Sequence, residues 1–273
     1  MSDQETEELR DYATRILETE DLVTKLAPPP LVLVDSPCDV AHRPAMPGRP
    51  PSLKPEHGKK VKVPRVQGMQ DLNQRVRILH ALANHELQAV ELFAWGIVAF
   101  PDTPGAYRRG LLSILLEEQI HCNLYIERIE AMGHSFGDFP VSNHLWNQTK
   151  DIWDPSTFIC ALGLTFENAN LDFALEYKAE AEKVGDFETA KVLQRVHEDE
   201  IRHVAFSWRW HKKFSEEKDL WEKYTQSLPP ALSPGRARGR DFDRAARIAA
   251  GIAPDFIDRL EYETSLRPNG TPR

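Results

Sequence analysis

Residues 193–207 read LQRVHEDEIRHVAFS, and a carboxylate stands in the middle of the apolar face that this segment would form as a helix. That face follows from a spacing of three and four residues, shared by Leu193, Val196, Glu200, Val204 and Ser207. An ionised carboxylate is costly to bury unless a counter-charge or a metal ion lies beside it. His203 follows Glu200 by three residues and would lie on the same side, about one turn away. The segment therefore predicts a helix that carries a functional group in the core.

Three further stretches have the same helical spacing, each with a glutamate near the middle of its apolar stripe. Proline is absent from 65–100, 105–139 and 156–228, and these windows suit long helices because an interior proline costs about 3 kcal/mol. The third window is long enough for two helices, with Gly185-Asp186 as the break. Four helices of about 25–30 residues follow. The glutamates on their apolar stripes are Glu86, Glu118, Glu167 and Glu200.

The lengths of the connections predict how these helices are arranged. Residues 101–105 form a tight turn between the first two helices, which should therefore be antiparallel, and the second pair is joined just as tightly. A longer link, 133–155, separates the two pairs. Two hairpins with one long crossover are typical of a ferritin-like four-helix bundle. We therefore expect an all-α fold with this bundle over residues 65–228.

A Glu-x-x-His motif occurs twice, once in each hairpin. Glu86 precedes His121 by 35 positions, and Glu167 precedes His203 by 36. Each hairpin would thus give one glutamate from its first helix and a Glu-x-x-His from its second, which is the ligand set of di-iron and di-manganese bundles. The predicted metal-binding and catalytic residues are Glu86, Glu118, His121, Glu167, Glu200 and His203. The alternative is a set of buried Glu–His or Glu–Arg pairs without a metal.

Oxygen-rich ligands with one histidine per metal suit two iron ions best, with Mn/Fe and Mn/Mn as alternatives. Some neighbouring residues compete for a role in the site. Glu91 lies about 140° around the helix from Glu86, among polar positions, so Glu86 is the better ligand. Glu117 lacks a histidine three residues later, and Asp199 lies outside the apolar stripe. His197 could be a second-layer partner or a late ligand, but a core histidine is the interpretation that we favour. Tyr125 could gate the site or carry a radical, but a buried aromatic is the commoner role. Asn170 could orient Glu167.

The two ends of the chain differ from the bundle. Ten of the 20 prolines come before residue 65, so residues 1–64 are predicted to be a short acidic helix near 3–26 and an extended, proline-rich arm. Residues 229–273 hold an arginine-rich stretch, 235–247, and a short helix opened by Pro254. The arginines could recognise phosphate or RNA. Docking of this tail onto an acidic bundle is the interpretation that we favour.

Composition excludes several classes of protein. No apolar run approaches the roughly 20 residues that span a bilayer, which argues against a membrane protein. The N-terminus lacks the layout of a secretion signal, so a cytoplasmic location is expected. Three scattered cysteines are too few for a disulfide framework or a cysteine-based zinc site. The net charge of −8 disfavours nonspecific binding of nucleic acid.

Three stretches carry a resemblance to a known family: Asn84 to Leu92 (NHELQAVEL), Glu117 to His121 (EEQIH) and Glu198 to Val204 (EDEIRHV). They resemble a bacterial ferritin-like family that is catalogued as domain of unknown function 455, over roughly residues 40–250. A more distant similarity is to the di-iron hydroxylase that modifies an isopentenyl-adenosine in tRNA. The resemblance implies a di-metal carboxylate site made of the six residues above. The distant similarity implies oxygenase chemistry without establishing an RNA substrate.

The leading functional hypothesis is an O2-activating di-iron oxidase or monooxygenase that acts on an unknown small molecule. It would need an external electron donor and would be a monomer or a homodimer. Iron storage by a ferroxidase is an alternative, although such centres generally use a single Glu-x-x-His. Peroxide reduction is another, but the usual Cys-x-x-Cys electron-transfer module is absent. The last alternative is a non-enzymatic scaffold that binds metal only for stability.

Overall fold

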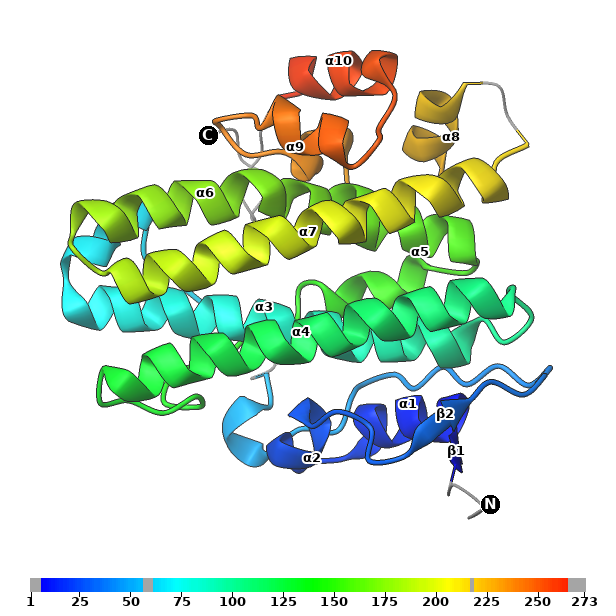
Figure 1. Ribbon diagram of the computed structural model, residues 1–273, viewed down its shortest axis with the longest axis horizontal. Helices are drawn as coiled ribbons and strands as arrows, with labels where there is room; N and C mark the ends of the chain where they lie inside the picture. Colours follow the sequence, from blue (N-terminus) through cyan, green and yellow to red (C-terminus); the bar gives the residue numbers. More distant parts are fainter. Residues whose placement is uncertain (1–5, 56–60, 217–218, 265–273) are drawn as a thin grey trace. The chain divides into compact units, whose positions relative to one another are not determined.

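The structure is a computed structural model that describes residues 6–55, 61–216 and 219–264 (Figure 1). This part of the chain is mostly helical, which confirms the all-α prediction. The chain divides into two compact units, Met1–Asn147 and Gln148–Arg273, and each is described by itself. Among the described residues, none of the helices combines the length and the apolar character that crossing a membrane requires.

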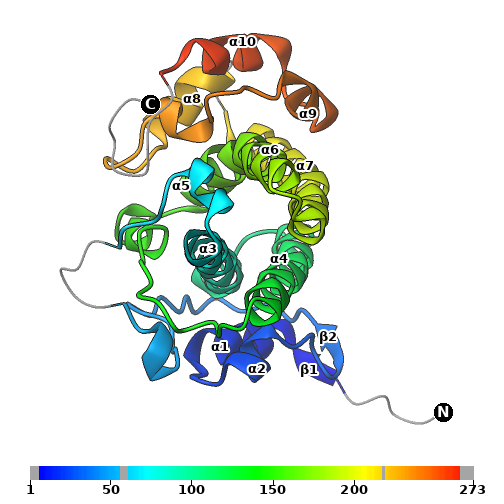
Figure 2. The same ribbon diagram turned by 90° about the vertical axis from the view of Figure 1, so that its left-hand side faces the viewer.

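The first unit is built on two long helices, α3 (Leu72–Ala99) and α4 (Gly105–Ala131), which lie side by side and antiparallel (Figures 1 and 2). Asp71 caps α3 by accepting a hydrogen bond from the Gln74 backbone N–H at 2.9 Å. Both helices fall within the proline-free windows, and the short turn between them is the predicted one. The helical hairpin is therefore encoded locally, by one cap and one proline-containing turn.

Two short helices of the N-terminal arm pack against this hairpin: α1 (Leu9–Glu18) contacts α3, and α2 (Leu22–Leu26) contacts α4 (Figure 2). The sequence predicts one acidic helix near 3–26, whereas the structure has two. The chain becomes extended at Thr19, and Asp21 caps the new helix through the Thr24 backbone N–H. Residues 3–5 of that prediction lie outside the described residues.

Over its described residues 27–55 and 61–64, the rest of the arm has little regular secondary structure, as its prolines predict. It contains one feature that the sequence did not indicate, a parallel pairing of β1 (Thr6–Glu8) with β2 (Val32–Val34). Two short 3₁₀ turns complete it, η1 (Pro51–Leu53) and η2 (Val66–Gln70). The link after α4 holds a third turn, η3 (Trp146–Asp151).

The second unit contains another hairpin. Its first limb is three consecutive helical segments, α5 (Pro155–Ala161), η4 (Leu162–Glu167) and α6 (Asn168–Lys183). The second limb is α7 (Phe187–Phe214), which packs against α6 (Figure 1). The break falls at Gly185-Asp186 as predicted, because Gly185 adopts a φ of +75° and Asp186 caps α7.

The segment η4 is a π-helix, and the sequence pattern did not reveal it. A π-helical turn is wider than an α-helical one, and such turns are frequent at functional sites. The Thr165 hydroxyl donates to the Cys160 carbonyl, five residues back, at 2.7 Å. Gly163 lies against α7 here: a Cβ built on it would come within 2.3 Å of the Ser207 Cβ and 1.8 Å of its Oγ. The close packing of the two limbs thus depends on a residue without a side chain.

We predict that Gly163→Ala lowers the free energy of unfolding by about 1–3 kcal/mol, because the added methyl group overpacks the contact with Ser207. Alanine at an unconstrained helix position would instead stabilise by up to about 1 kcal/mol. Urea denaturation of the purified variants measures the difference. Adding Ser207→Gly should restore most of the loss, with Ser207→Gly alone as the control. Wild-type stability of Gly163→Ala would show that the contact is not constrained.

The C-terminal tail packs onto the second unit through short helices (Figure 1). These are α8 (Leu220–Gln226), η5 (Pro234–Ala237), α9 (Arg244–Ala249) and α10 (Pro254–Tyr262). The helix after Pro254 agrees with the prediction. Aromatic rings hold α10 in place: Phe256 lies within 5.0 Å of the Trp208 ring centroid and 5.2 Å of that of Tyr224.

Candidate metal centre

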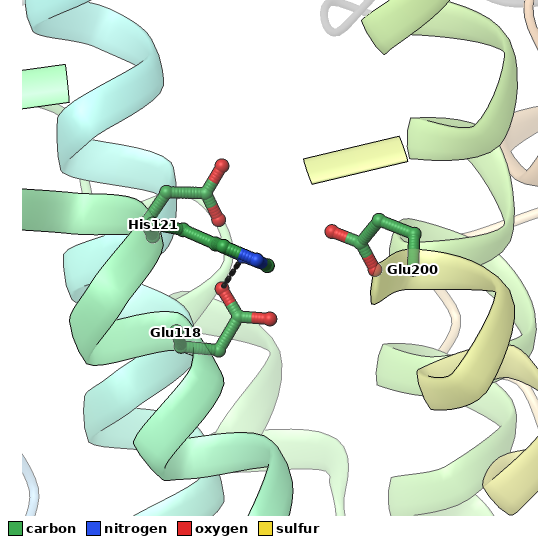
Figure 3. Close-up of side chains that lie close together, drawn as sticks. Glu118, His121 and Glu200 are labelled. Carbon is green, nitrogen blue, oxygen red and sulfur yellow. Dashed lines mark ion pairs between the residues drawn. The ribbon is translucent and has the colours of Figure 1, made fainter. Parts of the chain in front are cut away.

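The first unit buries three of the predicted ligands together. Glu86 comes from α3, and Glu118 and His121 come from α4. Their exposed fractions are 5%, 0% and 0%. Each residue offers one ligand atom, and these three atoms all lie within 4.8 Å of one another. Figure 3 shows the ion-pair contact of His121 Nδ1 with Glu118 Oε2, at 3.5 Å. We call these three residues the first half-site.

The second unit repeats this arrangement with Glu167, Glu200 and His203, which we call the second half-site. Glu167 is the last residue of η4, while Glu200, labelled in Figure 3, and His203 belong to α7. All three are buried, and one ligand atom of each lies within 4.8 Å of the others. His203 Nδ1 is 3.2 Å from Glu200 Oε2 and 3.8 Å from Glu167 Oε2.

The six predicted residues therefore occur as two matching buried groups of three. In each group, the three-residue spacing of Glu-x-x-His brings a carboxylate and an imidazole to one side of a helix, as expected. The opposite helix of the hairpin adds a second carboxylate. The chain thus buries two clusters of two carboxylates and one imidazole, each of which could hold a metal ion.

One hydrogen bond fixes a carboxylate of the second half-site. The Asn170 side-chain amide donates to Glu200 Oε1 at 2.7 Å. The sequence suggests Asn170 as a partner of Glu167, whereas the hydrogen bond goes to Glu200 on the opposite helix. Glu167 ends the π-helical segment, and Asn170 lies in the first turn of α6, which follows it. An amide donor of this kind orients a carboxylate.

Glu91, the rival of Glu86, has a different role in the structure. It is fully buried and lies 2.5 Å from Arg49 Nη2 and 3.3 Å from Lys25 Nζ. Protein cations therefore compensate its charge. Burial lowers the pKa of Lys25, and the nearby negative charge of Glu91 opposes that effect. Glu91 is a structural anchor for the N-terminal arm in this unit.

The other neighbours also have identifiable surroundings. Asp199 pairs with Arg195 at 2.5 Å and with Arg202. His197 Nε2 lies 3.0 Å from Asp243 Oδ2, so it contacts the C-terminal tail. Tyr125 is 1% exposed and is a core residue of α4.

The cysteine beside the first half-site is in its thiol form. Burial raises the pKa of Cys122 well above its ordinary value, and the negative charge of Glu86 raises it further. The thiol donates to the Ala83 carbonyl with a sulfur–oxygen distance of 3.4 Å. The residue groups that could hold a metal ion contain only glutamate and histidine among the described residues, so their donors are carboxylate oxygen and imidazole nitrogen. Such donors fit iron or manganese.

A separate feature of the first unit is a cavity of about 270 Å³ beside α3, whose wall includes His80, Arg77 and Phe139. Burial lowers the pKa of His80 to about 4, while the charge of Asp138 opposes this. His80 Nε2 accepts a hydrogen bond from the Gly137 backbone N–H at 2.9 Å. The imidazole is therefore neutral at physiological pH, with its proton on Nδ1.

This pKa predicts a pH dependence of stability. The folded pKa of His80 lies below its ordinary value of 6.5, so the unfolded chain binds a proton first and stability falls between pH 6.5 and 4. We expect wild type to lose about 2 kcal/mol more than His80→Gln between pH 7.5 and pH 5. Urea denaturation of both proteins at both pH values measures this. An identical loss in the two proteins would contradict the depressed pKa.

Two buried Glu, Glu-x-x-His groups on helical hairpins define the class of the site: a helical protein with carboxylate–histidine clusters suited to metal ions. Its sequence matches the family described as "Protein of unknown function (DUF455)" over residues 5–258. That match covers most of the chain, so the protein belongs to the DUF455 family. No curated protein and no solved structure matches it.

Proposed function

We propose that the two half-sites together form one di-metal centre, holding two iron ions in a ferritin-like four-helix bundle over residues 65–228. The centre would activate dioxygen in an oxidase or monooxygenase. Its substrate would be a small molecule, and an external donor would deliver the electrons. The resemblance to ferritin-like di-metal proteins supports the same class of chemistry.

One observation carries the proposal: the same three ligands occur twice, at equivalent places in two hairpins. Each half-site has two buried carboxylates and one imidazole, so even a protonated imidazole would leave it with a net negative charge. Four carboxylates and two imidazoles are the ligand set of di-iron and di-manganese bundles. Two divalent cations would balance the four carboxylates, which makes burial of this set favourable.

The residues of the chain would bind and orient the metal pair. Glu86, Glu118, Glu167 and Glu200 would bind through oxygen, and His121 and His203 through nitrogen. Asn170 holds one oxygen of Glu200, which limits the ways in which that carboxylate can rotate. Burial of all six residues would keep bulk water away from bound ions. When bound, the pair of ions would supply the electrons for the first reduction of dioxygen.

Anaerobic loading with Fe(II), followed by exposure to oxygen, tests this function. We expect about two Fe(II) per chain to bind, and oxygen uptake in proportion to the bound iron when oxygen is admitted. An oxygen electrode measures uptake, and Mössbauer spectra follow the oxidation of the iron. Wild-type protein that binds iron without consuming oxygen would contradict the oxygen-activating function. Protein that binds no iron would contradict the metal centre as well.

A further inference from the structure

Each half-site is followed by a buried acid at the same distance in sequence. Glu91 comes five residues after Glu86 in α3, and Asp172 comes five residues after Glu167, in α6. Five residues correspond to about 140° around a helix, so each acid lies on a different side of its helix from the ligand. Both acids are buried, at 0% and 2% exposure.

An arginine of the N-terminal arm binds the acid of the first unit. Arg49 Nε lies 2.9 Å from Glu91 Oε1, and Arg49 Nη2 lies 2.5 Å from Glu91 Oε2. The same guanidinium donates to Asn84 Oδ1 at 3.0 Å. Asn84 comes before the ligand Glu86 in α3, and Glu91 comes after it. Arg49 therefore contacts α3 at two points that are about two helical turns apart, with Glu86 between them in sequence. Arg49 is 2% exposed.

An arginine of the C-terminal tail binds the acid of the second unit in the same way. Arg247 Nη1 and Nη2 lie 2.8 and 3.0 Å from the two carboxylate oxygens of Asp172. Arg247 Nη2 also donates to the Asn168 carbonyl at 3.0 Å, directly after Glu167. The guanidinium carbon lies 3.8 Å from the centroid of the Phe242 ring, and the side chain is fully buried.

The second pair has a direct structural route to a ligand. Arg247 binds Asn168 and Asp172, and Asn170 lies between these two residues in the same helical turn. Asn170 is the residue that donates to Glu200. Any rotation of this turn would therefore move both Glu167, at its start, and the hydrogen bond to Glu200.

The first unit has a comparable second contact beside Glu118. Gln119 Nε2 donates to the Lys25 carbonyl at 2.9 Å and to the Ala27 carbonyl at 3.0 Å, both in the N-terminal arm. Gln119 also exchanges a hydrogen bond with the Tyr12 hydroxyl of α1. The arm thus contacts α4 at the residue next to Glu118, as Arg49 contacts α3.

Buried ion pairs contribute little net stability compared with apolar residues of similar volume, but they fix geometry. Bidentate arginine–carboxylate pairs are the most strictly oriented of them. We propose that Arg49 and Arg247 are positioning residues: each fixes the rotation of the helical turn that carries a ligand, and so sets the metal affinity of its own half-site. The inference rests on the proposed metal centre. It gives the N-terminal arm and the arginine-rich tail the same role, one for each half-site.

Conservative variants separate positioning from simple stability. Arg49→Lys and Arg247→Lys keep the charge but lose the two-pronged geometry. The control is Arg244→Lys, which changes a more exposed tail arginine that pairs with Glu261 at 2.6 Å and with Asp258. Co(II) is the probe, because its visible absorption follows the binding at each position. His121→Ala and His203→Ala assign the two binding phases to the first and second half-site.

We expect Arg49→Lys to weaken Co(II) binding about 10–100-fold at the first half-site, which is the phase that His121→Ala loses. Arg247→Lys should have the same effect at the second half-site, which is the phase that His203→Ala loses. Arg244→Lys should bind as wild type does. Unchanged affinities in both lysine variants would overturn the proposal. If a lysine variant weakened both binding phases equally and also had a lower melting temperature, the effect would be a general loss of structure, and the proposal would again be overturned. Absence of Co(II) binding in wild type would refute the metal centre itself, and the positioning role with it.

A measurement on the wild-type protein covers the case in which the variants do not fold. Coupling is reciprocal, so metal binding should tighten the contact between the tail and Asp172. The backbone N–H groups of Gly239 and Asp243 both donate to Asp172, each at 2.7 Å. Hydrogen exchange at these two amides should slow on addition of Co(II), while exchange in α10 should not change. Equal exchange with and without metal would overturn the proposal.

Discussion

Replacing Glu118 by alanine is expected to remove the metal ion of the first half-site. Glu118 is fully buried, contacts His121 and belongs to the first half-site. Loss of an outer-layer partner already weakens metal binding about 10–100-fold, and loss of a ligand should cost more. We expect the iron content to fall from about two ions per chain to about one, with oxygen uptake at background. Plasma mass spectrometry of the desalted protein measures the iron.

The matched control is Glu117→Ala, which makes the same change in charge one position earlier. Glu117 is only half-buried and has no histidine three residues later. It should therefore retain both ions and the oxygen uptake of wild type. If Glu118→Ala kept its iron, or if the two variants lost it equally, Glu118 would not be a ligand.

Replacing Glu91 by alanine is expected to cause the largest loss of stability, about 3–5 kcal/mol, because it leaves two buried cations without their carboxylate. Arg49 and Lys25 are 2% and 0% exposed in the pairs they form with Glu91. Burial already lowers the pKa of Lys25, so in the variant this residue can lose its proton. That would reduce the cost of the unpaired charge at Lys25 but not at Arg49. Chemical denaturation of the metal-free variant measures the loss.

Glu86→Ala is the control for this variant, since it removes a buried carboxylate from the same helix. Glu86 shares its surroundings with Glu118, a like charge, so its removal from metal-free protein should cost much less. We expect Glu86→Ala to lose metal while keeping most of its stability, and Glu91→Ala to lose much more stability than Glu86→Ala. Equal losses of stability would contradict the distinction between ligand and structural acid.

The helices and the six candidate ligands could be predicted because their signals are local. Helical spacing, proline placement and the Gly185-Asp186 break locate α3, α4 and α7 without reference to the rest of the chain. Glu-x-x-His is a spacing within a single helix. The sequence could therefore identify each half-site from its own residues, and the structure brings the three residues of each half-site together.

The π-helical segment could not be predicted in this way. Residues 162–167 continue an apolar stripe, and a wider turn changes which neighbours are in contact without changing that pattern. Asn170 lies in the first turn after this segment and donates its hydrogen bond to Glu200 on the opposite helix, a contact that the sequence pattern did not indicate. Gly163 was a possible signal, because a glycine in the middle of a helix often marks a close approach of another backbone.

The two arginine–acid pairs were missed for a different reason. Arg49 and Glu91 are 42 residues apart, and Arg247 and Asp172 are 75 apart, so no local pattern connects them. A buried arginine in an extended, proline-rich arm has the same sequence signature as an exposed one. The equal offset of five residues from Glu86 and Glu167 was visible in the sequence, but it acquires meaning only once both acids are known to be buried and paired.

Diffraction at the iron absorption edge from crystals loaded anaerobically with Fe(II) tests the central claim most directly. The account predicts two anomalous peaks per chain, one within coordination distance of His121 and the other of His203, with carboxylate oxygens completing both. Crystals of protein shown to be folded and loaded with Fe(II) that gave no peak at these residues, or a single peak elsewhere, would contradict it.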